Sequence, residues 1–288
     1  MRFAIATIDR YLGVFEALCQ AGWTPLKLFT VPVRDPDFGN HQAAIAFADK
    51  KGVAIQLSRM SQKDIADLGI AGCDVLVVAG YDWKIPDWNL LVKYAVNFHP
   101  APLPAGRGPY PLPRAILEGH SLWGMACHRL TGQIDAGEIL ASEHFALRAD
   151  ECHESLDLRV QMAAKRLAGR VARNFAELWQ SAVPQTSGSY WPRITPTDRV
   201  VDLAKPLDDV LRHVRAFGRT GSLVNINGTW LIVRRAIGWP ETHELAAGAV
   251  VHVNGRTIVV ATADGYLAVL ESDMAPPHLA ADLTGTRT

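Results

Sequence analysis

Short apolar runs alternate with helix-spaced segments along the first part of the chain. The apolar runs predict strands at residues 3–8, 25–31, 53–57, 74–79 and 94–98. Apolar positions three or four apart predict helices between them, at residues 11–21, 41–51 and 62–68. Uninterrupted apolar strands that alternate with helices are typical of a parallel sheet covered on both faces. The pattern therefore predicts an α/β domain with a doubly wound, mostly parallel sheet.

A different pattern follows the strand at residues 94–98. A loop rich in proline and glycine leads to a predicted helix at residues 112–118. Two further strands, at residues 123–130 and 138–147, flank a turn. Over residues 156–178 the apolar positions recur every three or four residues. This spacing predicts one long amphipathic helix whose apolar stripe belongs to the core.

A second domain is predicted beyond a polar, proline-containing stretch. The first domain covers residues 1–185, and residues 186–201 have the composition of a linker. Residues 202–276 then hold one predicted helix and five short strands, at residues 207–217, 222–226, 230–236, 249–253, 257–261 and 267–271. Five short strands in this space predict a small β-rich barrel or curled sheet. Residues 277–288 are predicted to form a frayed tail.

Charge and composition narrow the classes of partner. The 288 residues include 29 basic and 29 acidic side chains, and a neutral chain has no general attraction for nucleic acid or anionic membranes. No stretch approaches the roughly 20 apolar residues of a spanning helix, and the first apolar run is too short for a signal peptide. Four cysteines without metal-binding spacing are expected to be reduced core residues: Cys19, Cys73, Cys127 and Cys152. We therefore expect a cytoplasmic protein that contacts no membrane.

Candidate chemistry gathers where the strand at residues 94–98 ends. Ligands of open α/β sheets bind outside the carboxyl ends of the strands. Asn97 and His99 lie there two residues apart, so in an extended chain their side chains point the same way. The prolines that follow stiffen the loop. Asp135 lies in the predicted turn between the next two strands. Without further information, a histidine at a strand end and an aspartate in a turn are ordinary features.

Two segments resemble a known family. Residues 97–108 read NFHPAPLPAGRG, which resembles the N-x-H-x-S-L-L-P-x-x-R-G signature of folate-dependent formyltransferases. Residues 134–140 read IDAGEIL and resemble the D-x-G-x-[IL]-[IL] segment of the same families. The interval from His99 to Asp135 also matches theirs. Together the two segments make a specific signal.

The likeness extends over about residues 1–275. Residues 74–81, 190–202 and 248–271 resemble, in turn, the strand and loop beside the folate pocket, the connector between domains, and the closing strands of a C-terminal barrel. Methionyl-tRNA formyltransferases and aminosugar N-formyltransferases share this two-domain plan. The resemblance implies a Rossmann-like catalytic domain followed by a small OB-like barrel. Related enzymes are often dimers, so a homodimer is expected, although the sequence locates no interface.

The resemblance also implies a reaction. The co-substrate would be 10-formyltetrahydrofolate, whose formyl carbon is attacked by an amine. Asn97 would donate a hydrogen bond to the developing oxyanion, and His99 would donate to it or move a proton. Asp135 would orient or charge-stabilise the imidazole and help to receive the amine's proton. Which of His99 and Asp135 is the base stays open, and the chemistry requires no metal.

Further binding residues follow from the same resemblance. The pterin ring would lie between a loop that holds Trp83 and Ile85 and a turn that holds Leu130, Gly132 and Ile134. Its contacts would be made mainly by backbone groups.

The acceptor is less well defined by the sequence. Arg107 either binds an anionic group of the acceptor or closes a turn, and Tyr110 is a second candidate for the acceptor site. The family's Ser-Leu-Leu is Ala101-Pro102-Leu103 here, which alters the loop near the acceptor.

Several observations favour a small-molecule amine, with a nucleotide-linked aminosugar as the leading candidate. Residues 33–40 lack the basic loop typical of methionyl-tRNA formyltransferase, and residues 186–288 hold ten basic and ten acidic side chains. A domain that grips tRNA is expected to be basic. Three alternatives stay open: a methionyl-tRNA formyltransferase, a 10-formyltetrahydrofolate hydrolase that uses the same three residues, and a non-catalytic binding module.

Overall fold

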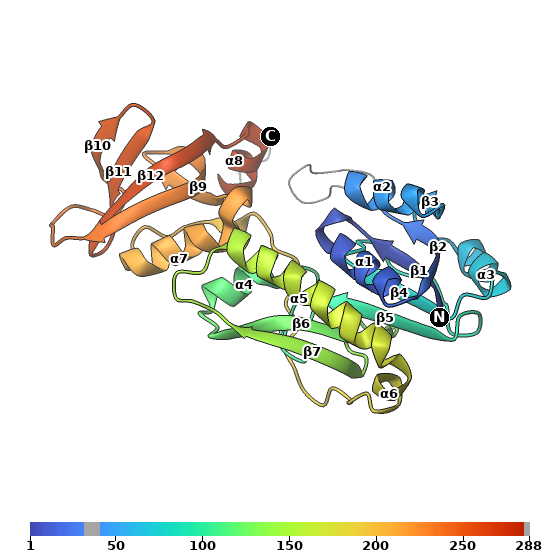
Figure 1. The fold of residues 1–288 in the computed structure, drawn as a ribbon. Helices are drawn as coiled ribbons and strands as arrows, with labels where there is room; N and C mark the ends of the chain where they lie inside the picture. Colours follow the sequence, from blue (N-terminus) through green and yellow to red (C-terminus); the bar gives the residue numbers. More distant parts are fainter. Residues whose placement is uncertain (32–40, 285–288) are drawn as a thin grey trace. The chain divides into compact units, whose positions relative to one another are not determined.

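Seven strands form one sheet in the order β3-β2-β1-β4-β5-β6-β7 (Figure 1). The computed structural model describes residues 1–31 and 41–284. The strands are β1 (Arg2–Thr7), β2 (Thr24–Phe29), β3 (Ala54–Gln56), β4 (Val75–Ala79), β5 (Tyr94–His99), β6 (Leu122–Arg129) and β7 (Ile139–Ala146). Strands β1 to β5 pair in parallel, whereas β6 pairs antiparallel with both β5 and β7. The predicted doubly wound, mostly parallel sheet is confirmed.

Helices cover both faces of this sheet, because every residue of a parallel core strand needs an apolar neighbour. On one face the Phe3 ring of β1 lies edge-on to the Phe15 ring of α1 (Leu12–Gln20), 5.9 Å between centroids. On the other face Ala4 of β1 belongs to a buried cluster with Ile65 of α3 (Gln62–Ile70). Successive side chains of β1 therefore contribute to apolar layers on opposite faces of the sheet. The remaining elements here are the 3₁₀ turn η1 (Asp9–Tyr11) and α2 (Gln42–Lys50).

The predicted long helix is two helices. The chain forms α5 (His153–Arg173) and then α6 (Phe175–Gln180), with Asn174 between them. The Arg170 carbonyl accepts from the Asn174 side chain at 3.1 Å as well as from the Asn174 amide at 3.3 Å, so the side chain competes for the acceptor of the helical hydrogen bond. Apolar spacing did not reveal the break because Phe175 is still buried on the same side. Figure 1 shows α5 beside α1, where Lys165 lies 2.7 Å from Glu16.

A five-stranded antiparallel sheet, in the order β10-β11-β12-β9-β8, forms the predicted β-rich part. Its strands are β8 (Ser222–Ile226), β9 (Thr229–Pro240), β10 (Val250–Asn254), β11 (Thr257–Ala261) and β12 (Gly265–Met274). Helix α7 (Leu207–Phe217) packs Val210 and Val214 into a buried apolar cluster with residues of these strands. Two 3₁₀ turns flank α7, η2 (Thr197–Arg199) and η3 (Gly218–Thr220).

The described chain divides into two compact units that are not simple halves of the sequence. The first unit is Met1–Pro111, Leu122–Ala146 and Leu158–Trp191. The second is Leu112–Ser121, Leu147–Asp157 and Pro192–Thr288. Helix α4 (Leu112–Leu117) thus lies in the second unit, beside α7.

The predicted tail at residues 277–288 is wrong in its first part, where α8 (Pro277–Thr284) is helical. The amides of Leu279 and Ala280 donate to the Pro276 carbonyl. Proline disrupts the interior of a helix, but it is well suited to the first turn. Pro277 is the first residue of α8, so it begins the helix and does not prevent it.

Candidate active site

The end of β5 brings two polar side chains to the centre of the first unit. Asn97 pairs with Val78 of β4 on one side and with His128 of β6 on the other. His99 is the last residue of β5 and is 5 % exposed. Because Asn97 and His99 are two residues apart in one strand, their side chains leave the sheet on the same face.

Asp135 reaches this strand end from the turn between β6 and β7. It has φ +52°, a left-handed conformation that, after glycine, asparagine and aspartate adopt more readily than most residues, and it is 8 % exposed. The Gly108 amide donates to its Oδ2 at 2.9 Å. A buried carboxylate in a turn requires such donors, because an unpartnered buried charge is costly.

Three predicted residues and one unpredicted histidine form a connected cluster. Asn97 Nδ2 donates to Asp135 Oδ1 at 3.1 Å and lies 3.2 Å from His128 Nε2. Asp135 Oδ2 lies 3.4 Å from His99 Nδ1, and Asp135 Oδ1 lies 3.4 Å from His128 Nε2. The carboxylate therefore contacts all three side chains. Because a carboxylate only accepts hydrogen bonds, it also fixes the Asn97 amide with its nitrogen toward the cluster.

Backbone carbonyls determine which ring nitrogens carry protons. His99 Nε2 lies 2.8 Å from the Gly106 carbonyl oxygen. A carbonyl only accepts, so Nε2 is the protonated nitrogen of a neutral ring, and Nδ1 presents its lone pair toward Asp135. His128 Nδ1 likewise donates to a backbone carbonyl, that of Arg129, at 2.8 Å.

Burial and the neighbouring groups shift two pKa values in this cluster. Burial lowers the pKa of His99 and His128 lowers it further, which together outweigh the raising effects of Asp135 and the Gly106 carbonyl. Burial acts to raise the pKa of Asp135, but the His128 hydrogen bond, the His99 charge and the Gly108 amide lower it to about 2. At neutral pH the site holds a neutral imidazole beside an ionised carboxylate.

Two family models match the chain. Residues 38–171 match the model described as formyl transferase, and residues 193–276 match that of the formyl transferase C-terminal domain. The chain belongs to the formyltransferase superfamily. The family predicted from the two sequence segments is thereby confirmed, and the members of this superfamily are enzymes.

Relatives and solved structures agree with this assignment. A methionyl-tRNA formyltransferase of Pseudothermotoga lettingae is 29% identical over 205 residues, which is 66% of this chain and 68% of the relative. A variant of HypX from Aquifex aeolicus superposes with a TM-score of 0.70 at 19% identity, over 99% of this chain and 48% of HypX. The chain thus spans about half the length of HypX, and a further HypX structure holds tetrahydrofolic acid.

A third similar structure is WlaRD, a sugar 3N-formyl transferase solved with dTDP and 5-N-formyl-THF. It superposes with a TM-score of 0.69 at 15% identity, over 94% of this chain and 97% of WlaRD. At such identities the likeness of HypX and WlaRD shows a shared fold.

His128 is the member of the cluster that the sequence did not predict. It is 1 % exposed and pairs with Asn97 across two antiparallel strands. The available signal was a polar residue inside an otherwise apolar strand, which is unusual in a buried sheet. That signal becomes specific only when the neighbour of β6 is known.

The residues predicted for the pterin ring lie partly together. Ile85 and Leu130 pack against one buried apolar cluster of the first unit. The Trp83 ring lies edge-on to the Tyr81 ring, 5.5 Å between centroids. Ile134 is 62 % exposed. Folate contacts by these residues stay a prediction.

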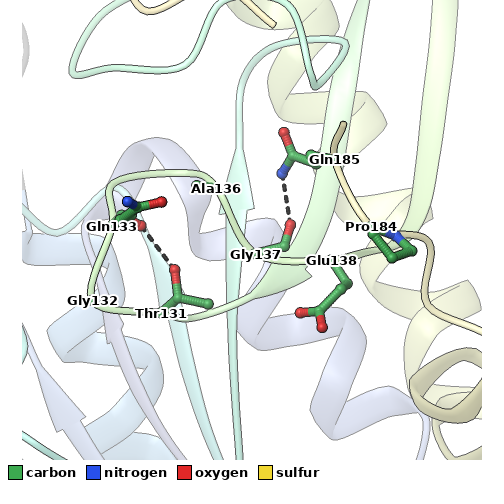
Figure 2. A pocket seen from close by; sticks show the side chains of 8 residues that line it. All are labelled: Thr131, Gly132, Gln133, Ala136, Gly137, Glu138, Pro184 and Gln185. Atoms are coloured by element: carbon green, nitrogen blue, oxygen red, sulfur yellow. Dashed lines mark hydrogen bonds between the residues drawn. The ribbon is translucent and has the colours of Figure 1, made fainter. Parts of the chain in front are cut away.

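Gly132 lines a pocket of about 470 Å³ beside the turn between β6 and β7 (Figure 2). Its walls are formed by the turn and by the chain that follows α6: Thr131, Gly132, Gln133, Ala136, Gly137, Glu138, Pro184 and Gln185. The pocket borders the segment that the sequence predicts for the pterin.

The two residues predicted to bind the acceptor have neighbours within the protein. Arg107 donates from Nε to Gln185 Oε1 at 2.9 Å and from Nη2 to the Ser187 carbonyl at 3.0 Å. These contacts match the alternative in which Arg107 holds the loop. The Arg10 guanidinium lies 5.6 Å from the centroid of the Tyr110 ring. Acceptor binding by Arg107 and Tyr110 stays a prediction.

Two kinds of feature are absent from the described residues. Within residues 1–31 and 41–284, no group of three or more His, Cys, Asp or Glu side chains is arranged to hold a metal ion. Over the same residues, no helix has the length and apolar character needed to cross a membrane.

Proposed function

We propose that this protein transfers the formyl group of 10-formyltetrahydrofolate to an amino group of a small molecule. The observation that carries the proposal is the buried cluster at the end of β5, in which one carboxylate contacts Asn97 and His99. Membership of the superfamily supports the reaction type, and the folate compounds held by HypX and WlaRD support the co-substrate.

In the proposed reaction the amine nitrogen attacks the formyl carbon, and the carbonyl oxygen gains negative charge. The Asn97 amide donates to that oxygen, a contribution of about 2.7–4 kcal/mol in well-studied acyl transfer. One hydrogen of the Asn97 amide donates to Asp135, and this bond orients the second hydrogen before substrate binds. The bond between the formyl carbon and N10 then breaks, and N10 takes up the proton that the amine gives up and leaves as tetrahydrofolate.

The attacking amine must also lose a proton, and His99 is the proposed acceptor. Its neutral ring presents the lone pair of Nδ1 toward Asp135, 3.4 Å away. Protonation of Nδ1 turns an unfavourable lone-pair contact into a charged hydrogen bond, so the carboxylate favours the product of proton transfer. Asp135, with a pKa of about 2, is a weak base itself and acts as the charge partner.

The proposed acceptor class rests on charge. The residues from 186 onward carry equal numbers of basic and acidic side chains. In the second unit Arg234 and Arg235 are paired with Asp273 and Glu271. Paired arginines offer little net charge to a phosphate backbone. An amine on a small metabolite, with a nucleotide-linked aminosugar as first candidate, therefore fits better than a nucleic acid.

Charged initiator tRNA is the second candidate acceptor, because relatives with 26–32% identity are methionyl-tRNA formyltransferases. The two candidates differ in their salt dependence. The affinity for tRNA, which is bound through many phosphates, falls steeply as the salt concentration rises. The affinity for a small acceptor, which forms few ion pairs with the protein, depends much less on salt.

A transfer assay tests the proposal. The enzyme is incubated with 10-formyltetrahydrofolate and either an aminosugar nucleotide, a hydroxyornithine-like amine, charged initiator tRNA or no amine, and tetrahydrofolate is measured. Amine-dependent tetrahydrofolate formation with a small acceptor is expected. Equal formation without amine would instead indicate a hydrolase, and a response to tRNA alone would replace the acceptor class.

A further inference from the structure

The chain that follows α6 runs along the two loops that build the site. It begins at Val183, which exchanges two backbone hydrogen bonds with Ile139 at the start of β7, at 2.8 and 2.9 Å. It ends at Trp191, whose amide donates to the Arg107 carbonyl at 2.7 Å. We refer to residues 183–191 as the bracing segment. It belongs to the first unit, although most of it falls in the stretch with linker composition.

Gln185 is the residue of the bracing segment that touches the Asp135 turn. Its Nε2 donates to the Asp135 carbonyl at 2.9 Å and to the Gly137 carbonyl at 2.6 Å. Its Oε1 accepts from Arg107 Nε at 2.9 Å. Figure 2 shows the side chain directed at Gly137. The Gln185 amide thus donates both hydrogens to the Asp135 turn and accepts one hydrogen bond from Arg107, which lies on the other loop.

The two loops joined by Gln185 either carry or contact the side chains of the proposed site. The loop at residues 104–108 contributes the Gly106 carbonyl to His99 and the Gly108 amide to Asp135. The turn carries Asp135 itself, in a left-handed conformation that L-residues adopt only at isolated positions. The two bonds from Gln185 hold this turn on either side of Ala136.

The rest of the bracing segment fixes the loop at residues 104–108. Ser189 accepts from the Arg107 amide through its carbonyl at 3.0 Å and from the Gly106 amide through Oγ at 2.9 Å. Gly188 lies so close to Pro104 that an added Cβ would come within 2.2 Å of the proline carbonyl oxygen. The Trp191 ring stacks on Trp123, 5.7 Å between centroids. These contacts give Gln185 a fixed base from which to hold the turn.

We propose that Gln185 is a positioning residue for formyl transfer, which holds the Asp135 turn against the loop at residues 104–108 so that the carboxylate stays within reach of Asn97 and His99. This inference rests on the proposed function, because its effect on kcat can be measured only if the protein catalyses formyl transfer. Gln185 itself contacts none of the three side chains and acts through the backbone of the turn.

The test compares Gln185→Met with Gln180→Met, an equal change on an exposed residue of α6. Methionine keeps the length of the side chain and adds no charge, but it forms none of the three hydrogen bonds. Gln185→Met is expected to lower kcat by about 10- to 100-fold, as displacements near 1 Å do, with a smaller change in KM. Gln180→Met is expected to leave both constants unchanged.

A second variant separates the two halves of the contact. Gln185→Glu can still accept from Arg107 but places a carboxylate against the carbonyls of Asp135 and Gly137. Loss of kcat comparable to that of Gln185→Met is expected. A wild-type kcat in Gln185→Glu would show that only the contact with Arg107 matters and would overturn the positioning role.

A readout without turnover keeps the inference distinct from the proposed function. The ionisable groups that act on His99 are Asp135 and His128. Asp135 raises the pKa of His99, so displacement of the turn in Gln185→Met is expected to lower that pKa in an NMR titration, with His99→Gln to assign the signal. An unchanged His99 titration, or a change in KM alone with full kcat, would overturn the inference. A wild-type protein without transfer activity would remove the proposed function but leave the titration as a test.

Discussion

Two histidines, one in each unit, show what distinguishes the site from the rest of the molecule. Burial lowers the pKa of both, that of His213 to about 4. His213 of α7 lies 3.1 Å from the Ser222 hydroxyl, and its ring is tilted against Phe217. His99 instead faces the Asp135 carboxylate. Burial favours the neutral form of each ring. The group that favours protonation of His213 is the Asp198 backbone, whereas His99 also has the charged carboxylate of Asp135 beside it.

The largest expected effect contrasts these histidines. His99→Gln removes the proposed proton acceptor and is expected to lower kcat by about 10²- to 10⁴-fold. His213→Gln, which is remote from any carboxylate contact, is expected to leave kcat unchanged. Steady-state kinetics of both variants, with thermal unfolding as a check on folding, makes the comparison. Equal losses in the two variants would indicate a general effect of burying a polar side chain.

The pH dependence sharpens the same contrast. Because the pKa of His99 is lowered from 6.5, the ring is neutral at pH 7 and above. Then kcat/KM is expected to be constant above about pH 6.5 and to fall about tenfold per unit as the pH drops below the His99 pKa. The acidic limb is expected to be absent in His99→Gln. An optimum on the acidic side, with activity lost on the way to pH 7, would mean that protonated His99 is the active form.

The sequence predicted much of the first unit because its signals are local. The apolar runs and their periods are written in consecutive residues, and so is the pair Asn97 and His99. His128 and Gln185 were missed for a common reason. Each acquires its role from a partner far away in the chain, Asn97 across β6 and the Asp135 turn, respectively. Likewise the end of α5 depends on a hydrogen bond made by Asn174.

A smaller effect is expected from backbone crowding, which also differs between the site and the rest of the chain. Gly108 has φ +112°, and a Cβ there would lie 2.1 Å from the Trp191 carbonyl oxygen. Gly108→Ala is therefore expected to destabilise the protein by about 1–3 kcal/mol. Gly169→Ala, inside α5 with only the Arg173 side chain nearby, is expected to stabilise it by about 0.5–1 kcal/mol. Denaturant unfolding gives both values, and a neutral Gly108→Ala would contradict the close packing of the bracing segment.

The smallest effect is expected on the surface of the second unit. Arg235 lies 3.1 Å from Glu271, and both side chains are more than half exposed. Solvent screens such pairs, so Arg235→Gln is expected to change the free energy of unfolding by less than about 1 kcal/mol and to leave transfer unaffected. Marked loss of transfer with tRNA but not with a small amine would assign this surface to the acceptor.

Asp135 is the centre of the proposed site, because its carboxylate contacts Asn97, His99 and His128 together. Asp135→Asn keeps the size of the side chain but replaces one acceptor oxygen by a donor. The most direct test measures 10-formyltetrahydrofolate binding and formyl transfer on this one variant. If the carboxylate organises the site, binding is expected to stay near normal while transfer falls by at least about 100-fold. Transfer at the wild-type rate would contradict this role of the carboxylate.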